Sequence, residues 1–226
     1  MHIEPGVVDG AKIALSYGTA AGAATYATKA TGDSIRRDGG LAALILRSAI
    51  ATVLVFCFFQ VLPHHPVGVS EVHFILGSTL LLLFGVGPAA IALASGLALQ
   101  GLFFAPFDLP QYGMNVTTLL VPLFGIHMLA KRIIPAGTAY TDITYAQAFA
   151  LSSAYQGGIV AWVAFWAFYG QGVNATTLTS VSSFGAAYMA VVLIEPVVDL
   201  AVLAAAKAKR GATSGAAFTA RLHKAA

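Results

Sequence analysis

The most distinctive chemical feature of the sequence is a histidine at its second position. The α-amine of Met1, the amide nitrogen of His2 and the imidazole of His2 can bind one cation together, because they close a five-membered and a six-membered chelate ring. Methionine removal needs a small second residue, so His2 predicts that Met1 is retained. Planar nitrogen coordination suits nickel(II) and copper(II) and accommodates cobalt(II), whereas magnesium and calcium prefer oxygen. A solvated histidine without a ligand is the alternative interpretation.

Three further histidines and an asparagine could support such a site. His73 is the candidate fourth ligand, because an ionisable residue at the end of an apolar segment is a functional candidate by default; taken alone, it could equally cap or anchor a helix. His64 and His65 could gather metal at the mouth of the site or be solvated loop residues. Asn115 could cap a helix or orient an imidazole through a hydrogen bond.

The composition places these residues in a membrane protein. The chain has 226 residues, of which 58% are hydrophobic and 9% are charged, and its mean hydropathy is +0.81. Soluble domains are about 25% charged, so the bilayer is the natural solvent for this chain. The single cysteine, Cys57, excludes a disulfide within the chain and a four-cysteine metal site. The sequence has no P-loop, so ATP-driven transport would need another subunit to hydrolyse the nucleotide.

Seven apolar segments are candidates for membrane spans. They are roughly Val7–Ala27, Leu41–Leu62, Val72–Phe84, Pro88–Phe104, Val116–Ala130, Tyr145–Tyr169 and Ser182–Ala206. A full span needs about 20 residues, so the third, fourth and fifth are short. The pattern predicts an all-α integral membrane protein, a bundle of about seven transmembrane helices that forms a single transmembrane domain over residues 1–226.

The basic residues of this arrangement fall on one side of the membrane. Ten of the twelve do so: Lys29, Arg36, Arg37, Lys131, Arg132, Lys207, Lys209, Arg210, Arg221 and Lys224. The opposite loops, near residues 63–71, 105–115 and 170–181, contain neither lysine nor arginine. The positive-inside rule then places the N-terminus outside and the C-terminus in the cytoplasm. Residues 1–6 become an extracytoplasmic metal-binding segment, and residues 207–226 become a basic cytoplasmic tail.

Several charged residues fall inside the predicted spans. Glu195 and Asp199 are four residues apart, so both carboxylates lie on one face of a helix. Lys12 or Arg47 could neutralise them, and an internal ion pair is favoured over a cation relay.

Small residues dominate positions 18–24 of the first span. Such residues let helices approach closely. They indicate either close packing within this bundle or a docking face for a partner membrane subunit.

Three blocks of the sequence, in this order, resemble the CbiM/NikM family. Family members typically open Met-His-Ile-Pro-Asp-Gly, and this chain opens Met1-His2-Ile3-Glu4-Pro5-Gly6. A second block, approximately Ser-Val-His-Leu followed later by Leu-Gln, is matched by Ser70-Glu71-Val72-His73 and by Leu99-Gln100. The third block, commonly Gly-Gly-Leu-Thr-Thr-Leu-Gly-Ala-Asn, corresponds to residues 107–115 and ends at Asn115. The resemblance covers roughly residues 1–125.

The resemblance implies a substrate-binding S component of an energy-coupling factor transporter. Its substrate would be Co²⁺ or Ni²⁺, held by the Met1 amine, His2 and His73, with an N-terminus folded into the outer mouth. The chain would bind no nucleotide and would not be an enzyme. Its expected partners are a transmembrane coupling subunit, ATPase subunits and optionally a small accessory membrane subunit, but no nucleic acid. The expected location is the inner (plasma) membrane of a prokaryote, which the chain would cross several times.

The sequence also departs from the family pattern. Glu4-Pro5 replaces Pro-Asp, and the third block gains Asp108 and Pro110. Asp108 or Glu71 could therefore supply an oxygen ligand and weaken a preference for nickel. Ser70 and Glu71, like Asn115, are candidate accessory residues beside the metal.

Three other functions compete with this interpretation. A stand-alone divalent-metal channel or secondary carrier would need a polar pathway through the bundle. An intramembrane enzyme would use Ser70, Glu71 and His73 as catalytic groups, but three neighbours on one loop do not easily converge as a base, an orienting group and an oxyanion site. A structural subunit would carry no metal.

Overall fold

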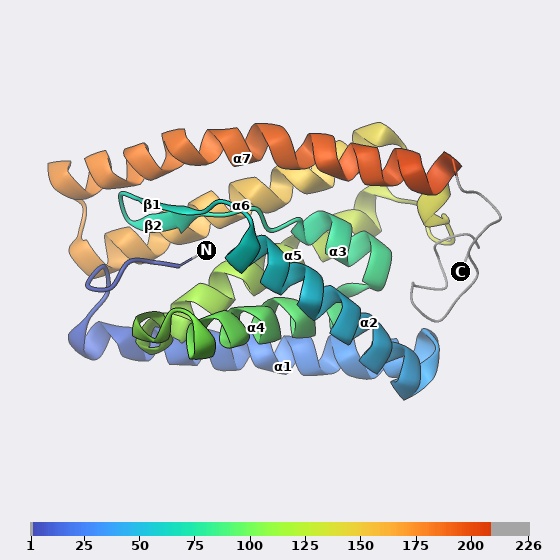
Figure 1. The fold of residues 1–226 in the computed structure, drawn as a ribbon, viewed down its shortest axis with the longest axis horizontal. Helices are drawn as coiled ribbons and strands as arrows, with labels where there is room; N and C mark the ends of the chain where they lie inside the picture. The colour runs from blue at the N-terminus through green and yellow to red at the C-terminus, as the bar shows by residue number, and fades with distance from the viewer. Residues whose placement is uncertain (1, 209–226) are drawn as a thin grey trace.

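The computed structural model describes residues 2–208 and shows a bundle of α-helices (Figure 1). Seven α-helices occur among the described residues: α1 (Ala14–Arg37), α2 (Gly40–Phe56), α3 (Gly77–Phe84), α4 (Val86–Phe103), α5 (Tyr112–Ile133), α6 (Tyr145–Gln171) and α7 (Ala175–Ala208). Short helical turns join some of them: η1 (Gly10–Ile13), η2 (Cys57–Val61), η3 (Pro106–Gln111) and η4 (Tyr140–Asp142).

Five of the seven expected spans are long and apolar enough to cross a membrane. The corresponding segments are Gly40–Val61, Val86–Phe103, Pro106–Ile133, Tyr145–Gln171 and Ala175–Ala208. Helix α3 has 8 residues and therefore rises about 12 Å, which is far less than the hydrocarbon thickness of about 30 Å. The helical bundle and its multi-pass membrane character are confirmed.

The first helix lies further along the chain than its apolar pattern predicts. We expect a span over residues 7–27, but α1 runs from Ala14 to Arg37. Val7 and Val8 are buried in an irregular segment before it. Lys29 therefore lies inside α1 rather than in the loop where the sequence pattern places it.

The prediction of an all-α fold misses a small β-hairpin between α2 and α3. Strand β1 (His65–Val67) pairs antiparallel with β2 (Ser70–Val72), with His65 opposite Val72. Gly68 has a φ of 62° at the turn, a conformation that glycine adopts without steric cost. The hairpin contacts α7, and Gly68 lies so close to Ser180 that a Cβ atom there would overlap the Ser180 carbonyl oxygen.

The N-terminal segment extends this hairpin as an additional edge. Ile3 forms an antiparallel bridge with Ser70, and the Glu4 amide donates to the Val69 carbonyl at 3.1 Å. The Glu71 amide donates to the His2 carbonyl at 2.9 Å. Backbone pairing thus fixes His2 beside the strand that leads to His73.

Six of the described basic residues lie towards the end of the bundle opposite the hairpin, whereas Lys12 lies at the hairpin end. The helix ends concerned can be followed in Figure 1. Lys29, Arg36, Arg37, Lys131, Arg132 and Lys207 lie near the C-terminal ends of α1, α5 and α7. Of the predicted tail, residues 209–226 lie outside the described residues. The one-sided pattern of charge is therefore present in the fold, and its orientation across the membrane stays a prediction.

The internal ion pair predicted for Glu195 and Asp199 does not form among the described residues. Arg47 is buried and pairs with Asp38 at 2.7 Å. Lys12 is exposed at the hairpin end, where its Nζ donates to the Gly170 carbonyl at 2.7 Å. Both carboxylates instead accept hydrogen bonds from groups of the chain around α3.

Candidate metal site

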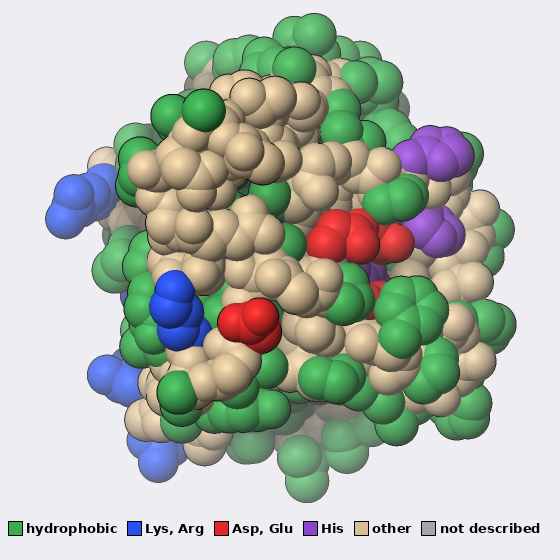
Figure 2. All heavy atoms as spheres, turned by 90° about the vertical axis from the view of Figure 1, so that its left-hand side faces the viewer, with side chains coloured by type: hydrophobic (Ala, Val, Ile, Leu, Met, Phe, Trp, Pro, Cys, Tyr) green, Lys and Arg blue, Asp and Glu red, His purple; other side chains and the backbone are tan. Residues whose placement is uncertain are grey.

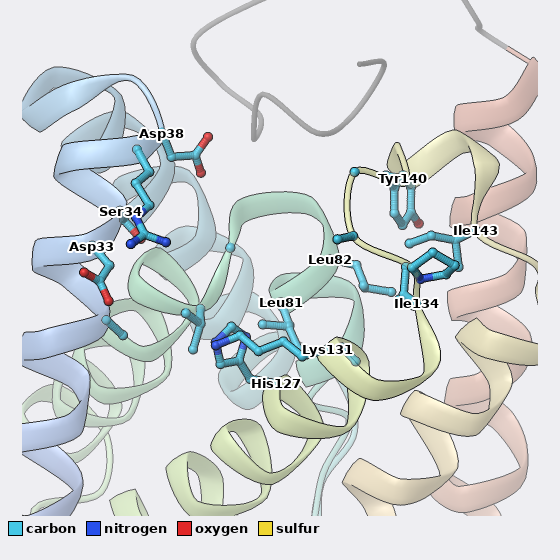
Figure 3. Close-up of a pocket in the computed structure, with 18 of the residues that line it drawn as sticks. Asp33, Ser34, Asp38, Leu81, Leu82, His127, Lys131, Ile134, Tyr140 and Ile143 are labelled. Carbon is cyan, nitrogen blue, oxygen red and sulfur yellow. The ribbon is translucent and has the colours of Figure 1, made fainter. Parts of the chain in front are cut away.

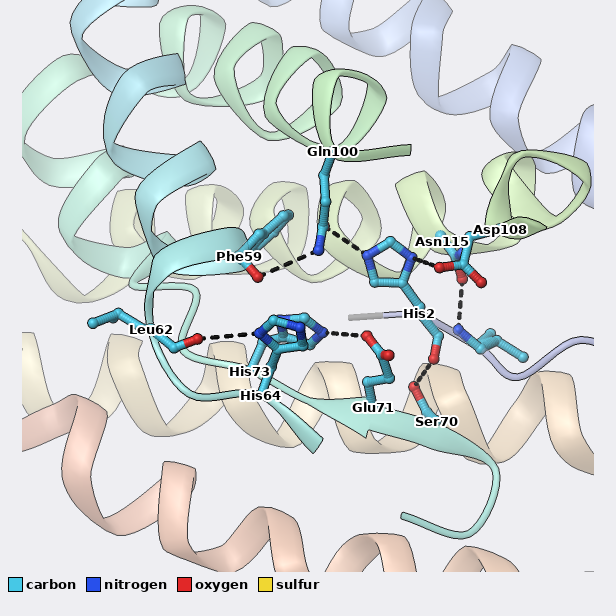
Figure 4. Close-up of polar contacts among 11 residues, drawn as sticks. His2, Phe59, Leu62, His64, Ser70, Glu71, His73, Gln100, Asp108 and Asn115 are labelled. Carbon is cyan, nitrogen blue, oxygen red and sulfur yellow. Dashed lines mark hydrogen bonds and ion pairs between the residues drawn. The ribbon is translucent and has the colours of Figure 1, made fainter. Parts of the chain in front are cut away.

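His2, Glu71 and His73 converge at the hairpin end of the bundle (Figure 4). One potential ligand atom from each lies within 4.8 Å of the other two, and the two imidazole centroids are 5.5 Å apart. Only 2% of His2 and 1% of His73 is exposed. No second group of three or more potential ligands occurs within residues 2–208. The fold therefore brings together two of the histidines that the sequence selects, although they are 71 positions apart.

Gln100 of α4 determines which nitrogen of His2 is available. The Gln100 side-chain NH₂ donates to the Phe59 carbonyl at 3.3 Å, so its oxygen must face His2. That oxygen lies 2.7 Å from Nε2 of His2, which must then carry the proton. Nδ1 keeps its lone pair in the neutral imidazole, and Nδ1 is the atom that closes a six-membered chelate ring with the His2 amide. In the sequence Gln100 is notable only as part of a block that resembles the family, and its contact with His2 emerges from the fold.

Asp108 on η3 also contacts His2. Its Oδ2 lies 2.9 Å from Nδ1 of His2, but the two atoms are not aligned as a hydrogen bond, and Nδ1 has no hydrogen-bond partner among the described residues. Two neighbouring ligands at right angles on a metal are also about 2.9 Å apart when each bond is about 2.0–2.1 Å. The Asp108 carboxylate is 4% exposed and is placed to act as an oxygen ligand.

Glu71 orients His73 in a comparable way. Its Oε2 accepts from Nε2 of His73 at 2.7 Å, while the buried Nδ1 of His73 has no hydrogen-bond partner among the described residues. Burial lowers the pKa of His73 well below its usual value, and the neighbouring His2 and His64 lower it further. This shift favours the neutral form of His73, which has a lone pair available for a metal.

The accessory candidates Asn115 and Ser70 hold the N-terminal segment rather than an imidazole. The Asn115 side-chain oxygen accepts from the Ile3 amide at 2.8 Å, and Asn115 lies within the first turn of α5 rather than at its cap. Asn115 therefore does not cap the helix, and its accessory role at the site stays a prediction. The Ser70 hydroxyl donates to the His2 carbonyl at 2.9 Å and not to His73, so the geometry gives no support to a serine nucleophile activated by histidine.

The two loop histidines differ in their relation to the site. His64 stacks on His73 with centroids 5.0 Å apart and planes 5° from parallel, and its Nδ1 contacts the Leu62 carbonyl at 3.1 Å. His65 is exposed on β1. Of the two, His64 is the one with a ring contact to a residue of the candidate site in the described part of the chain.

Carboxylates surround the site at this end of the molecule. Acidic side chains lie next to histidines on the face shown in Figure 2. Burial raises the pKa of Glu4, and the nearby Glu71 and Asp108 raise it further, because like charges disfavour ionisation. Such a group of carboxylates attracts cations. Met1 lies outside the described residues, so the position of its amine stays a prediction.

A cavity of about 590 Å³ lies at the opposite end of the bundle (Figure 3). Its lining includes Lys29 and Asp33 from α1, Leu82 from α3, and His127 and Lys131 from α5. None of the residues of the candidate metal site lines it. The metal site and this cavity are therefore separate features at the two ends of the same helices.

Comparisons with known proteins relate both the sequence and the fold to a known family. The family model for the cobalt uptake substrate-specific transmembrane region, CbiM, matches residues 2–212, including the last two helices that the sequence relates to the family by hydropathy alone. A crystal structure of a truncated transition metal transporter is similar, with a TM-score of 0.67 and 17% identity over 92% of this chain and 97% of that chain, which shows a shared fold. No curated protein matches. The resemblance seen in the first 125 residues is confirmed, and the chain belongs to the CbiM family of substrate-specific transmembrane regions for cobalt uptake.

Proposed function

We propose that this protein captures Co²⁺ or Ni²⁺ at the extracytoplasmic face, as the S component of an ATP-driven importer. The observation that carries the proposal is the buried convergence of His2, Glu71 and His73, in which an Nδ1 atom of each imidazole lacks a hydrogen-bond partner. A buried polar atom without a partner costs about 1–3 kcal/mol. A metal bound to these lone pairs would remove that cost.

The proposed ligands are mainly nitrogens. They are the Met1 amine, the His2 amide, Nδ1 of His2 and a nitrogen of His73, with Asp108 or Glu71 as an oxygen ligand. The chain's own contribution is to orient the imidazoles and exclude water: Gln100 fixes one ring, and Glu71 fixes the other. A mixed set of nitrogen and oxygen ligands accommodates Co²⁺ as well as Ni²⁺.

The energy for import would come from other subunits. The sequence has no P-loop, so we propose separate ATPase subunits joined through a transmembrane coupling subunit, in the plasma membrane of a prokaryote. Helix α1 offers a face for such a partner. Gly18 and Gly22 are exposed there, and a Cβ at either would meet nothing within 4 Å. Small residues of this kind allow a second membrane helix to approach closely.

The first experiment measures metal content and affinity of purified protein that begins at Met1-His2. A matched version carries a few extra residues before Met1, which removes the free amine but leaves every side chain in place. We expect the native form to bind about one Co²⁺ or Ni²⁺ per chain and the extended form to lose most of its affinity. Equal binding by both forms would show that the amine is not a ligand.

A second pair of variants tests the side chains. His73→Ala removes a buried ligand and should abolish tight binding, whereas His65→Ala removes an exposed histidine of the same hairpin and should leave affinity unchanged. If wild-type protein binds neither metal, metal capture by this site is refuted. Uptake of metal into vesicles that contain the chain alone would instead favour the channel or carrier.

A further inference from the structure

Glu195 connects the last helix to the turn that follows His73. It lies in α7 and is fully buried. Its carboxylate accepts hydrogen bonds from the backbone amides of Ile75 and Leu76, the latter at 3.0 Å. These amides belong to the second and third residues after the metal ligand His73. A side chain 122 positions away therefore holds the backbone next to the site.

The turn needs such an acceptor because its conformation is unusual. Leu76 has a φ of 54°, and it is the only residue other than glycine with a positive φ in residues 2–208. A leucine in this left-handed region is strained and persists only when its surroundings impose it. Ile75 and Leu76 are also buried, so their amides would lack a partner if the carboxylate were removed.

Neighbouring helices fix the carboxylate from the other side. Gln156 of α6 donates to Glu195 through its side-chain NH₂, and its oxygen accepts from the Tyr188 hydroxyl at 2.6 Å. Gly77, immediately after the turn, leaves no room for a Cβ atom against the Tyr155 ring. Residues of α6 and α7 thus hold the turn between His73 and α3 in a single arrangement.

We infer that Glu195 is a positioning residue for the metal ligand His73, acting through the turn formed by residues 73–76. The inference rests on the proposed function, because it concerns the geometry of the same metal site. It gives an intramembrane carboxylate a role other than carrying cations through the bundle. Removing its two hydrogen bonds should release the turn, move the imidazole and loosen the metal.

Asp199 supplies a matched control in the same helix. It is buried one turn beyond Glu195, and it accepts from the hydroxyls of Ser78 and Thr79. Those residues belong to the first turn of α3, so Asp199 supports the helix rather than the backbone next to His73. A change from carboxylate to amide has the same size and charge effect at both positions.

The experiment compares E195Q and D199N in the purified full chain. Three properties are measured: Co²⁺ affinity, the d–d absorption spectrum of bound Co²⁺ and the thermal stability of the metal-free protein. A glutamine can accept one backbone amide with its oxygen, but it presents an NH₂ group to the other. We expect E195Q to weaken Co²⁺ binding about 10–100-fold and to change the spectrum. D199N should lower thermal stability and leave the spectrum of bound Co²⁺ unchanged.

A rescue variant separates positioning from general destabilisation. Adding L76G to E195Q replaces the strained leucine with a residue that adopts a positive φ freely. We expect this double variant to recover part of the lost affinity and the wild-type spectrum. Adding L76G to D199N should leave both the Co²⁺ affinity and the spectrum as they are in D199N alone.

The outcomes also distinguish this inference from the proposed function. If wild-type protein does not bind Co²⁺, the proposed function fails first and this inference fails with it. If wild-type protein binds Co²⁺ and E195Q shows the same affinity and spectrum, only the positioning role is refuted. Should E195Q not fold, E195D keeps the charge but is too short to reach both amides, and unchanged binding by E195D would refute the role.

Discussion

The two imidazoles of the site are oriented by one oxygen acceptor each, and those acceptors come from different parts of the chain. Gln100 holds His2 across 98 positions of sequence, whereas Glu71 holds His73 from two positions away. Partners of this kind fix the tautomer of a ligand and are typically worth 10–100-fold in metal affinity. Mutating the acceptors Gln100 and Glu71 is therefore as informative as mutating the candidate ligands.

Replacing Gln100 should weaken metal binding without removing a ligand. Gln100→Leu leaves Nε2 of His2 without its acceptor, so the tautomer with a lone pair on Nδ1 is no longer favoured. We expect a loss of about 10–100-fold in Co²⁺ and Ni²⁺ affinity by calorimetry. Gln60→Leu, in the nearby turn η2, is the control and should bind as wild type. Unchanged affinity in Gln100→Leu would mean that the contact does not select the tautomer.

Replacing Asp108 should change the choice between metals. Asp108→Asn removes the anionic oxygen beside Nδ1 of His2 and leaves the nitrogen ligands in place. Because Ni²⁺ accepts a planar nitrogen set, we expect Co²⁺ affinity to fall about tenfold more than Ni²⁺ affinity in a competition experiment. Asp9→Asn, an exposed carboxylate at the same end, should leave the ratio unchanged. An equal loss for both metals would argue against Asp108 as a ligand.

At this scale the sequence identifies the two converging histidines better than the residues that orient them. His2 and His73 are predictable because a terminal chelate and a histidine at the end of an apolar segment are chemically unusual. The contacts of Gln100 and Asp108 are not predictable, because each depends on how α4 and η3 pack against the N-terminal segment. The sequence predicts a supporting role for Asn115, but it does not predict the partner, because the Ile3 amide lies 112 positions away along the chain.

Among the elements, the hairpin matters most because it carries His73 and pairs with the N-terminal segment. The two strands have three residues each, which is too short to show an alternating pattern of apolar and polar residues. The N-terminal segment is misread for a related reason. Val7 and Val8 look like the start of a span, but this segment packs against Gly170 of α6, where a Cβ atom would overlap the Val7 carbonyl oxygen.

The turn of the hairpin should be sensitive to a single methyl group. Gly68→Ala places a Cβ atom on the Ser180 carbonyl oxygen and forces a positive φ on alanine, so it should destabilise the protein by about 1–3 kcal/mol. Metal affinity should fall as well, because the hairpin carries His73. Gly157→Ala, where a Cβ meets nothing within 4 Å, is the control. Normal melting temperature and normal affinity in Gly68→Ala would show that the hairpin can move away from α7 at no cost.

For the whole molecule, the distribution of charge is predicted well because it depends on composition near helix ends rather than on packing. Six of the described basic residues lie near the C-terminal ends of α1, α5 and α7, whereas Lys12 lies at the hairpin end. The number of spans is predicted less well. Helix α3 is too short to cross a membrane, and α1 is absent from the five segments that meet the length and hydropathy requirements. Short apolar segments within a bundle look like spans because burial in protein and burial in lipid favour the same residue types.

The exposed face of α1 should matter to the assembled transporter and not to the isolated chain. Gly18→Leu with Gly22→Leu fills a face that is open in this structure, so the purified chain should keep its metal affinity. If a partner helix docks there, uptake of radioactive Co²⁺ by cells that contain the complete transporter should fall several-fold. The same double substitution at Ala21 and Thr25 would test how wide the face is. Normal uptake by the glycine variant would place the partner elsewhere.

The interior between the two ends of the bundle is largely apolar, and its buried carboxylates, Glu195 and Asp199, are held by hydrogen bonds. This has an electrical consequence. Leu80, Leu93 and Leu123 are buried midway along α3, α4 and α5, the helices that have the metal site at one end and the charged cavity at the other. An isolated ion is excluded from such an interior by its hydration energy. We therefore expect the chain in this conformation to conduct no ions, so a cell could keep it in the membrane without dissipating the resting potential or the ion gradients that depend on it.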